Sequence, residues 1–307
     1  MQILLTIAYD GTNYAGWQRQ ENAVAVQEKI ETALENLLLR EKISREENLR
    51  EKISCEKNLR EKTSCEKNLR EKTSCEKISR EKISCEKNLR EKNSCEKISC
   101  EEISQKIILR AASRTDAGVH ALGQRASFFA PQNFKIPVEK LPAVLRGFLP
   151  PDICVTHAET VSDDFNPQFD AKQKTYRYRI HTAQNPLLSR YSAFVPRDLD
   201  AKKMQAAAKF FVGRHDFAAF CATGSSAKTT VREIFDCVVR GAHAFEIEIT
   251  GGGFLYNMVR IIAGTLVYVG LGKISAEEIP EIIASKNRAK AGKTMPPHGL
   301  TLAEILY

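Results

Sequence analysis

The chain has 307 residues, with 46 Lys and Arg against 38 Asp and Glu and a net charge of +8. This length allows one large or two modest domains with their own cores, and the basic balance favours a polyanionic partner. The most apolar stretch, 258–271, is interrupted by Arg260 and is too short to span a bilayer, which argues against a membrane protein.

Cysteine usage indicates a reducing compartment. Six of the nine cysteines are copies within a repeat, and the other three, Cys154, Cys221 and Cys237, form no Cys-x-x-Cys pair. The pattern argues against a zinc site and a disulfide framework, so we expect no metal. Residues 1–7 have no basic leader and too short an apolar run for a signal peptide. We therefore expect a cytoplasmic protein.

The chain opens with a predicted strand, a turn and a helix. Residues 9–18, YDGTNYAGWQ, follow the first strand with turn signals and the only tryptophan. A packed tryptophan explains this segment at least as well as a chemical role does. Apolar residues then fall on one helical face over 26–38, which predicts a helix.

Residues 40–106 are a run of near-identical pentads that carries a net charge of +4, as do the other 240 residues. Each pentad advances about 140° around a helix, so its apolar residues form no stripe, and in a strand they would change face with every repeat. We expect a disordered or marginally helical excursion, with a solenoid or coiled coil as the alternative. It lies in a helix-to-strand connection, where added length costs little, so the core should fold around it.

Residues 114–121, RTDAGVHA, lie between two predicted strands, 106–112 and 123–129. Gly118 allows a tight turn that holds Asp116 at the rim of a sheet. A carboxylate there, beside a fixed guanidinium, suits a nucleophile or a general base. The alternative is an ordinary turn with Arg114 as a surface partner.

Residues 174–180, KTYRYRI, alternate strictly and predict a strand. Tyr176 and Tyr178 share one face, while Arg177 and Arg179 take the other. This arrangement suits a base-stacking wall with phosphate contacts, or else a half-buried strand with core tyrosines and a solvated basic face.

A third candidate segment is a predicted helix over 254–264, which has a broad apolar face. Arg260 lies on the other side with Asn257 and Gly264. It faces solvent by default, or holds an anion. The histidines are dispersed, and no phosphate-binding glycine loop or Ser-His-Asp set is present. Asp116 remains the best nucleophile candidate, without metal or organic cofactor.

Together these segments resemble the tRNA pseudouridine synthase A family. The motifs that carry the resemblance span nearly all of the chain outside the repeat: YDG to Gln18, RTDAGVHA at 114–121, FNPQFDA at 165–171, KTYRY at 174–178, GRHDF at 213–217, FLYNMVR at 254–260 and PHGLTL at 297–302. Gln168 departs from the pattern, because the family usually has arginine there, and the repeat replaces a short loop.

The resemblance implies an α+β fold of two ferredoxin-like halves with joined antiparallel sheets and a central active-site cleft. The first half would be residues 1–165, interrupted by the repeat at about 40–106, and the second 166–307. It also implies a homodimer that binds tRNA and an isomerase that converts uridine to pseudouridine in the anticodon stem-loop, at tRNA positions 38–40.

The resemblance further implies roles for four residues. Asp116 would be the nucleophile, Arg260 would pair with it, Tyr176 would stack on the target base, and Arg114 would contact RNA during base flipping. Attack at ribose C1′, addition at C6 and loss of a C2′ proton all remain open as routes. The alternatives are a non-catalytic tRNA-binding or RNA-folding module and a glycosidase-type hydrolase, which the lack of a second carboxylate in a comparable turn disfavours.

Overall fold

The computed structural model describes residues 1–45, 106–132 and 134–307. The chain divides into two compact units, residues 1–34 with 107–307, and residues 35–106. The predicted excursion of the pentad repeat lies outside the described residues, except that 40–45 are helical and residue 106 begins the return to the larger unit. No helix in the described part of the chain is long and apolar enough to cross a membrane.

The larger unit is built on one ten-stranded sheet. Its strands are β1 (Gln2–Tyr9), β2 (Arg110–Ala111), β3 (His120–Phe129), β4 (Ile153–Val161), β5 (Gln173–His181), β6 (Ala193–Phe194), β7 (Gly213–Asp216), β8 (Val231–Gly241), β9 (Ala244–Gly251) and β10 (Leu300–Leu306). The helices are the one that begins at residue 26, α2 (Leu141–Leu145), α3 (Ala201–Ala208), α4 (Met258–Gly270) and α5 (Ile279–Ser285).

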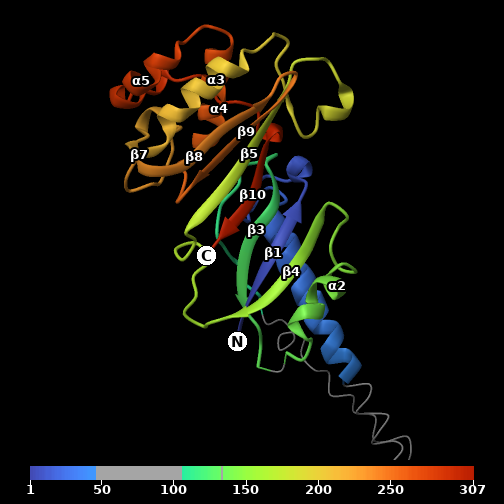
Figure 1. The fold of residues 1–307 in the computed structure, drawn as a ribbon. Helices are drawn as coiled ribbons and strands as arrows, with labels where there is room; N and C mark the ends of the chain where they lie inside the picture. The colour runs from blue at the N-terminus through green and yellow to red at the C-terminus, as the bar shows by residue number, and fades with distance from the viewer. Residues whose placement is uncertain (46–105, 133) are drawn as a thin grey trace, which may run out of the picture. The chain divides into compact units, whose positions relative to one another are not determined.

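The strand order repeats itself in the two halves of the sheet. The main path runs β4-β1-β3-β10-β5-β9-β8-β7 (Figure 1). Strand β2 pairs with β3 off this path. The strands β1 to β4 therefore take the order β4-β1-β3-β2, and the later ones take β10-β5-β9-β8, which is the ferredoxin-like order in each half. β10 joins the halves, antiparallel to β5 and parallel to β3. The predicted α+β fold with joined, mostly antiparallel sheets is confirmed; the boundary at residues 165 and 166 stays a prediction.

The edge of β3 is shared between two partners. Ala126 and Ser127 pair with β2, whereas His120 and Ala121 pair with β10. Between these two ladders, residues 112–116 leave the sheet. The strand predicted over 106–112 is therefore limited to Arg110–Ala111, because the chain turns away to form the site.

Helix α4 starts later and ends later than its apolar pattern predicts. Asn257 adopts a left-handed conformation with φ of 59°, so residues 254–257 precede the helix and Met258 begins it. Nearly every residue of α4 is buried, as expected for a helix that is apolar on most sides. The helix predicted over 26–38 is confirmed and continues to residue 45.

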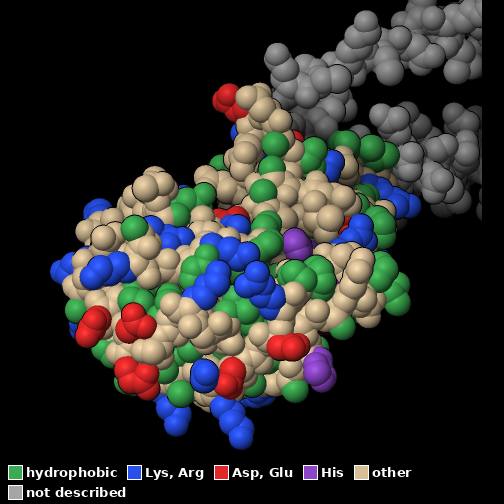
Figure 2. All heavy atoms as spheres, turned by 90° about the horizontal axis from the view of Figure 1, so that it is seen from above, with side chains coloured by type: hydrophobic (Ala, Val, Ile, Leu, Met, Phe, Trp, Pro, Cys, Tyr) green, Lys and Arg blue, Asp and Glu red, His purple; other side chains and the backbone are tan. Residues whose placement is uncertain are grey.

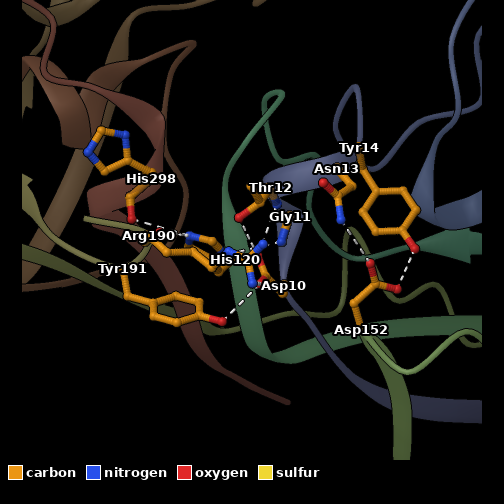
Figure 3. Close-up of polar contacts among 10 residues, drawn as sticks. All are labelled: Asp10, Gly11, Thr12, Asn13, Tyr14, His120, Asp152, Arg190, Tyr191 and His298. Carbon is orange, nitrogen blue, oxygen red and sulfur yellow. Dashed lines mark hydrogen bonds and ion pairs between the residues drawn. The ribbon is translucent and has the colours of Figure 1, made fainter. Parts of the chain in front are cut away.

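A polar cluster ties the two halves together near the end of β1 (Figure 3). The buried ring of His120 lies with Nδ1 3.1 Å from Asp10 Oδ1 and with Nε2 3.1 Å from the Arg190 carbonyl and 3.2 Å from that of His298. Tyr191 donates its hydroxyl to Asp10 Oδ2 at 2.9 Å. Asp10 and His120 come from the first half and the other three residues from the second.

Candidate active site

The turn that carries Asp116 is held by its neighbours in space. Gly118 has φ of +76°, so the predicted tight turn is present. The Trp17 N–H donates to the Thr115 carbonyl at 3.1 Å, and the Gly118 N–H donates to the Tyr14 carbonyl at 3.3 Å. Trp17 itself is 1% exposed and packs near Tyr9. The segment of residues 9–18 thus serves as a support for the Asp116 turn.

Arg260 pairs with Asp116. Its Nη1 donates to Asp116 Oδ2 at 2.9 Å and also to Asn257 Oδ1, and its Nε donates to the Met295 carbonyl at 2.7 Å. The default expectation that Arg260 faces solvent is wrong, because only 14% of its side chain is exposed. A guanidinium fixed by three acceptors holds the carboxylate in one orientation.

Tyr176 lies on β5, and its ring is 5% exposed. Its hydroxyl shares a hydrogen bond of 2.8 Å with Ser113 Oγ, and its ring meets that of Phe254 edge-on at 5.1 Å between centroids. Burial raises the pKa of Tyr176 to about 12; the Ser113 hydrogen bond lowers it and the charge of Asp116 raises it further. The side chain is therefore a neutral phenol at physiological pH.

These three side chains surround one cavity of about 820 Å³. Arg114 also lines it and is exposed, as a group that contacts a large ligand must be. The structure thus brings together all four residues singled out in the sequence. Among the described residues, no group of three His, Cys, Asp or Glu is arranged to hold a metal ion.

The cations beside Tyr176 are not part of the cavity. Arg177 Nε donates to Glu248 at 2.7 Å and Arg179 Nε donates to Glu246 at 3.0 Å, on the face of the sheet opposite the tyrosines. The strict alternation is therefore confirmed. The phosphate-contact interpretation of these two arginines is not supported, because carboxylates of β9 already pair with them.

Some groups that shape the site were missed in the sequence. Lys174 lies two residues before Tyr176, so the same alternation places it on the cavity side of β5. Gln168, which was singled out in the sequence, also lines the cavity. By contrast, no local signal predicts the contacts of Gln124 or Ser113, because they depend on strand pairing across the sheet.

Comparisons with known proteins agree with this arrangement. A family model described as tRNA pseudouridine synthase matches residues 5–170 and 207–307. The tRNA pseudouridine synthases A of Caldicellulosiruptor saccharolyticus and Acetivibrio thermocellus are each 39% identical over 308 residues, covering 99% of both chains. That of Bacillus licheniformis is 45% identical over 206 residues, covering 66% of this chain and 83% of its own.

The family match and these relatives place the chain in the class of enzymes that modify uridine in tRNA, and its joined ferredoxin-like sheet carries the Asp116–Arg260 pair at a cavity. The chain belongs to the tRNA pseudouridine synthase family. Asp116, Arg114 and Arg260 lie within the matched residues, and Tyr176 lies between the two matched ranges.

Proposed function

We propose that this protein is an isomerase that converts uridine to pseudouridine in tRNA. The observation that carries the proposal is the Asp116–Arg260 pair, which joins the two halves of the fold at a cavity beside Tyr176. The reaction needs a fixed carboxylate near the ribose and a flat wall for the base, and in this proposal Asp116 and Tyr176 supply them.

The target base must leave its stack before it can react. An everted uridine would enter the cavity with its base against the ring of Tyr176, and the stacking would offset part of the lost pairing. Asp116 would attack ribose C1′ as the N1–C1′ bond breaks. The freed uracil would turn, and C5 would bond to C1′ as the ester bond between C1′ and Asp116 breaks and restores the carboxylate. The C5 proton would leave to solvent and N1 would take up a proton. Nothing is released from the nucleotide except that proton.

A basic surface favours tRNA as the substrate. Arg110, Arg114, Arg232 and Arg260 all line the cavity, with Asp116 as its acidic partner. Figure 2 shows a group of Lys and Arg side chains in the middle of one face, while the lower rim carries both basic and acidic side chains. Such a field attracts phosphates and steers RNA toward the cavity. Arg114 is the group proposed to contact RNA during base flipping.

We extend the proposal to the anticodon stem-loop at tRNA positions 38–40, to a homodimer and to a cytoplasmic location, on the basis of family membership. Light scattering during gel filtration tests the dimer directly. If the measured mass at micromolar concentration were that of a single chain, about half the mass of a dimer, the result would contradict the homodimer. Mapping of the modified positions in reacted tRNA tests the anticodon assignment.

The decisive experiment uses tRNA tritiated at uridine C5. We expect the wild-type protein to release tritium, whereas a non-catalytic binding module would release none and a hydrolase would free uracil. The Asp116→Asn variant keeps the shape of the turn but loses the charge and the nucleophile. We expect it to release no tritium while its tRNA affinity stays within about tenfold, or about 1.4 kcal/mol. Weakened binding with unchanged turnover of bound tRNA would contradict the role of Asp116.

A further inference from the structure

Residues 112–116, called here the Asp116 arm, leave the sheet where regular strand pairing stops. The Ala112 N–H still donates to the Arg125 carbonyl at 2.8 Å. In a regular antiparallel pair the Arg125 N–H would donate back to the Ala112 carbonyl. Here that N–H donates to Gln124 Oε1 at 3.2 Å, so the carbonyl is open to another donor.

Side chains from two strands supply the missing donors. Lys174 Nζ on β5 donates to the Ala112 carbonyl at 2.7 Å. Gln124 Nε2 on β3 donates to the next carbonyl, that of Ser113, also at 2.7 Å. Lys174 is 9% exposed and Gln124 is fully buried. Burial makes each bond costly to lose, because the carbonyl would be left without a partner.

Two hydroxyl contacts continue this pattern along the arm. Tyr176 bonds Ser113 Oγ at 2.8 Å, and Tyr9 bonds Thr115 Oγ1 at 2.7 Å. Three of the five residues of the arm are thus bonded by side chains of β1, β3 and β5. After the Ala112 and Ser113 carbonyls, which these side chains hold, the chain continues through Arg114 and one further residue to Asp116.

We propose that Lys174 and Gln124 are positioning residues, which hold two successive carbonyls of the Asp116 arm so that Asp116 and Arg114 reach the cavity in a fixed geometry. The inference rests on the proposed function. Its physical basis is that a displacement of about 1 Å in a reacting group lowers turnover by about 100-fold. Binding of tRNA depends on the wider basic surface and should change little.

The test compares Lys174→Met, Lys174→Arg and Gln124→Met in the tritium-release assay, with kcat and KM measured separately. Lys172→Met is the matched control, because Lys172 lies two residues away with an exposed side chain. We expect Lys174→Met and Gln124→Met to lower kcat by about 10-fold to 100-fold with KM nearly unchanged. Lys174→Arg, which keeps a cationic donor, should retain most of the kcat, and Lys172→Met should behave like the wild type.

The double variant gives a second readout. Because both side chains hold one arm, the double variant should be about as slow as the slower single variant, whereas independent effects would multiply. If Lys174→Met does not fold, Gln124→Met and Lys174→Arg still test the arm.

Two results would overturn the inference: unchanged kcat in both single variants, or a loss confined to KM, which would make Lys174 a direct tRNA contact. If the wild-type protein released no tritium, the result would instead contradict the proposed function.

Discussion

At the scale of single residues, Lys174 differs from the other cations of the cavity. The cations Arg110, Arg114 and Arg260 are arginines, whereas Lys174 is a lysine whose pKa burial lowers to about 8. Its ammonium therefore loses its proton in a range where enzymes are routinely assayed. A neutral amine is the weaker donor to the Ala112 carbonyl.

We predict that turnover of the wild type falls as the pH rises through about 8, and that Lys174→Arg does not show this fall. Stability should change in the opposite direction. The folded pKa lies below the roughly 10.4 of a free lysine, so burial of the ammonium costs stability at lower pH, and that cost is relieved between these two values. Rate profiles and urea unfolding from pH 7 to 10 measure both. A parallel fall of rate and stability would contradict the prediction.

The sequence indicated the reacting residues of the site better than the contacts that hold them in place. Asp116, Tyr176 and Arg260 belong to motifs with a recognisable order, so they could be named before any contact was known. The pairing of Arg260 with Asp116 followed only from the family resemblance, because 144 positions separate the two residues in the chain and no local pattern joins them. The ion pairs of Arg177 were not foreseen for a related reason: its glutamate partners lie on β9, and no local pattern in β5 reveals them.

At the scale of elements, the turn before residue 18 packs directly against the Asp116 arm. Gly16 has φ of +97°, and a Cβ at this position would lie 2.6 Å from the Thr115 carbonyl oxygen. The turn can therefore approach the arm closely only with glycine. Sequence patterns showed that glycines and turns were present here, but the close approach depends on two segments about 100 residues apart.

We predict that Gly16→Ala lowers the free energy of unfolding by about 1–3 kcal/mol, because both the backbone conformation and the contact with Thr115 become strained. It should also lower kcat, since Thr115 precedes Asp116. Gly253→Ala is the matched control, because a Cβ there meets no atom within 4 Å. It should change stability by less than about 0.5 kcal/mol. Equal melting temperatures for the two variants would refute the proposed strain.

At the scale of the whole molecule, the Asp10 cluster of Figure 3 links the halves that jointly form the cavity. Burial acts to raise the pKa of Asp10, but hydrogen bonds from Thr12 and Tyr191, with the nearby charge of His120, hold it below its ordinary value. A carboxyl with a lowered folded pKa stabilises the protein above its unfolded pKa of about 3.9, and this contribution is lost as the pH falls further.

We therefore expect Asp10→Asn to lower stability at pH 7 and to weaken the loss of stability between pH 5 and 3. Denaturant unfolding across that range measures both effects. Asp200→Asn provides a comparison, because Asp200 also has a lowered pKa from hydrogen bonds to backbone N–H groups but lies at the start of α3, outside this cluster. Of these two variants, Asp10→Asn alone should also reduce turnover, because Asp10 contacts residues of the other half of the fold and Asp200 does not belong to this cluster. Equal turnover in the two variants would show that the Asp10 cluster does not affect catalysis.

The pentad repeat belongs to a unit distinct from the one that holds the cavity. The cavity-lining residues that the structure describes lie in 1–34 or 107–307, and the period of five residues gives the repeat no face to bury. We predict that deletion of residues 45–101 leaves tritium release within about twofold of the wild type. The shorter connection should add about 1 kcal/mol to the free energy of unfolding, because loop closure costs less entropy. A variant in which a Gly/Ser segment of equal length replaces residues 45–101 distinguishes the effect of loop length from that of the repeat sequence. Its free energy of unfolding should equal that of the wild type, and its rate of tritium release should equal that of both the wild type and the deletion variant. A deletion variant that folds but loses activity, with activity also lost in the Gly/Ser variant, would show that the repeat itself acts on tRNA.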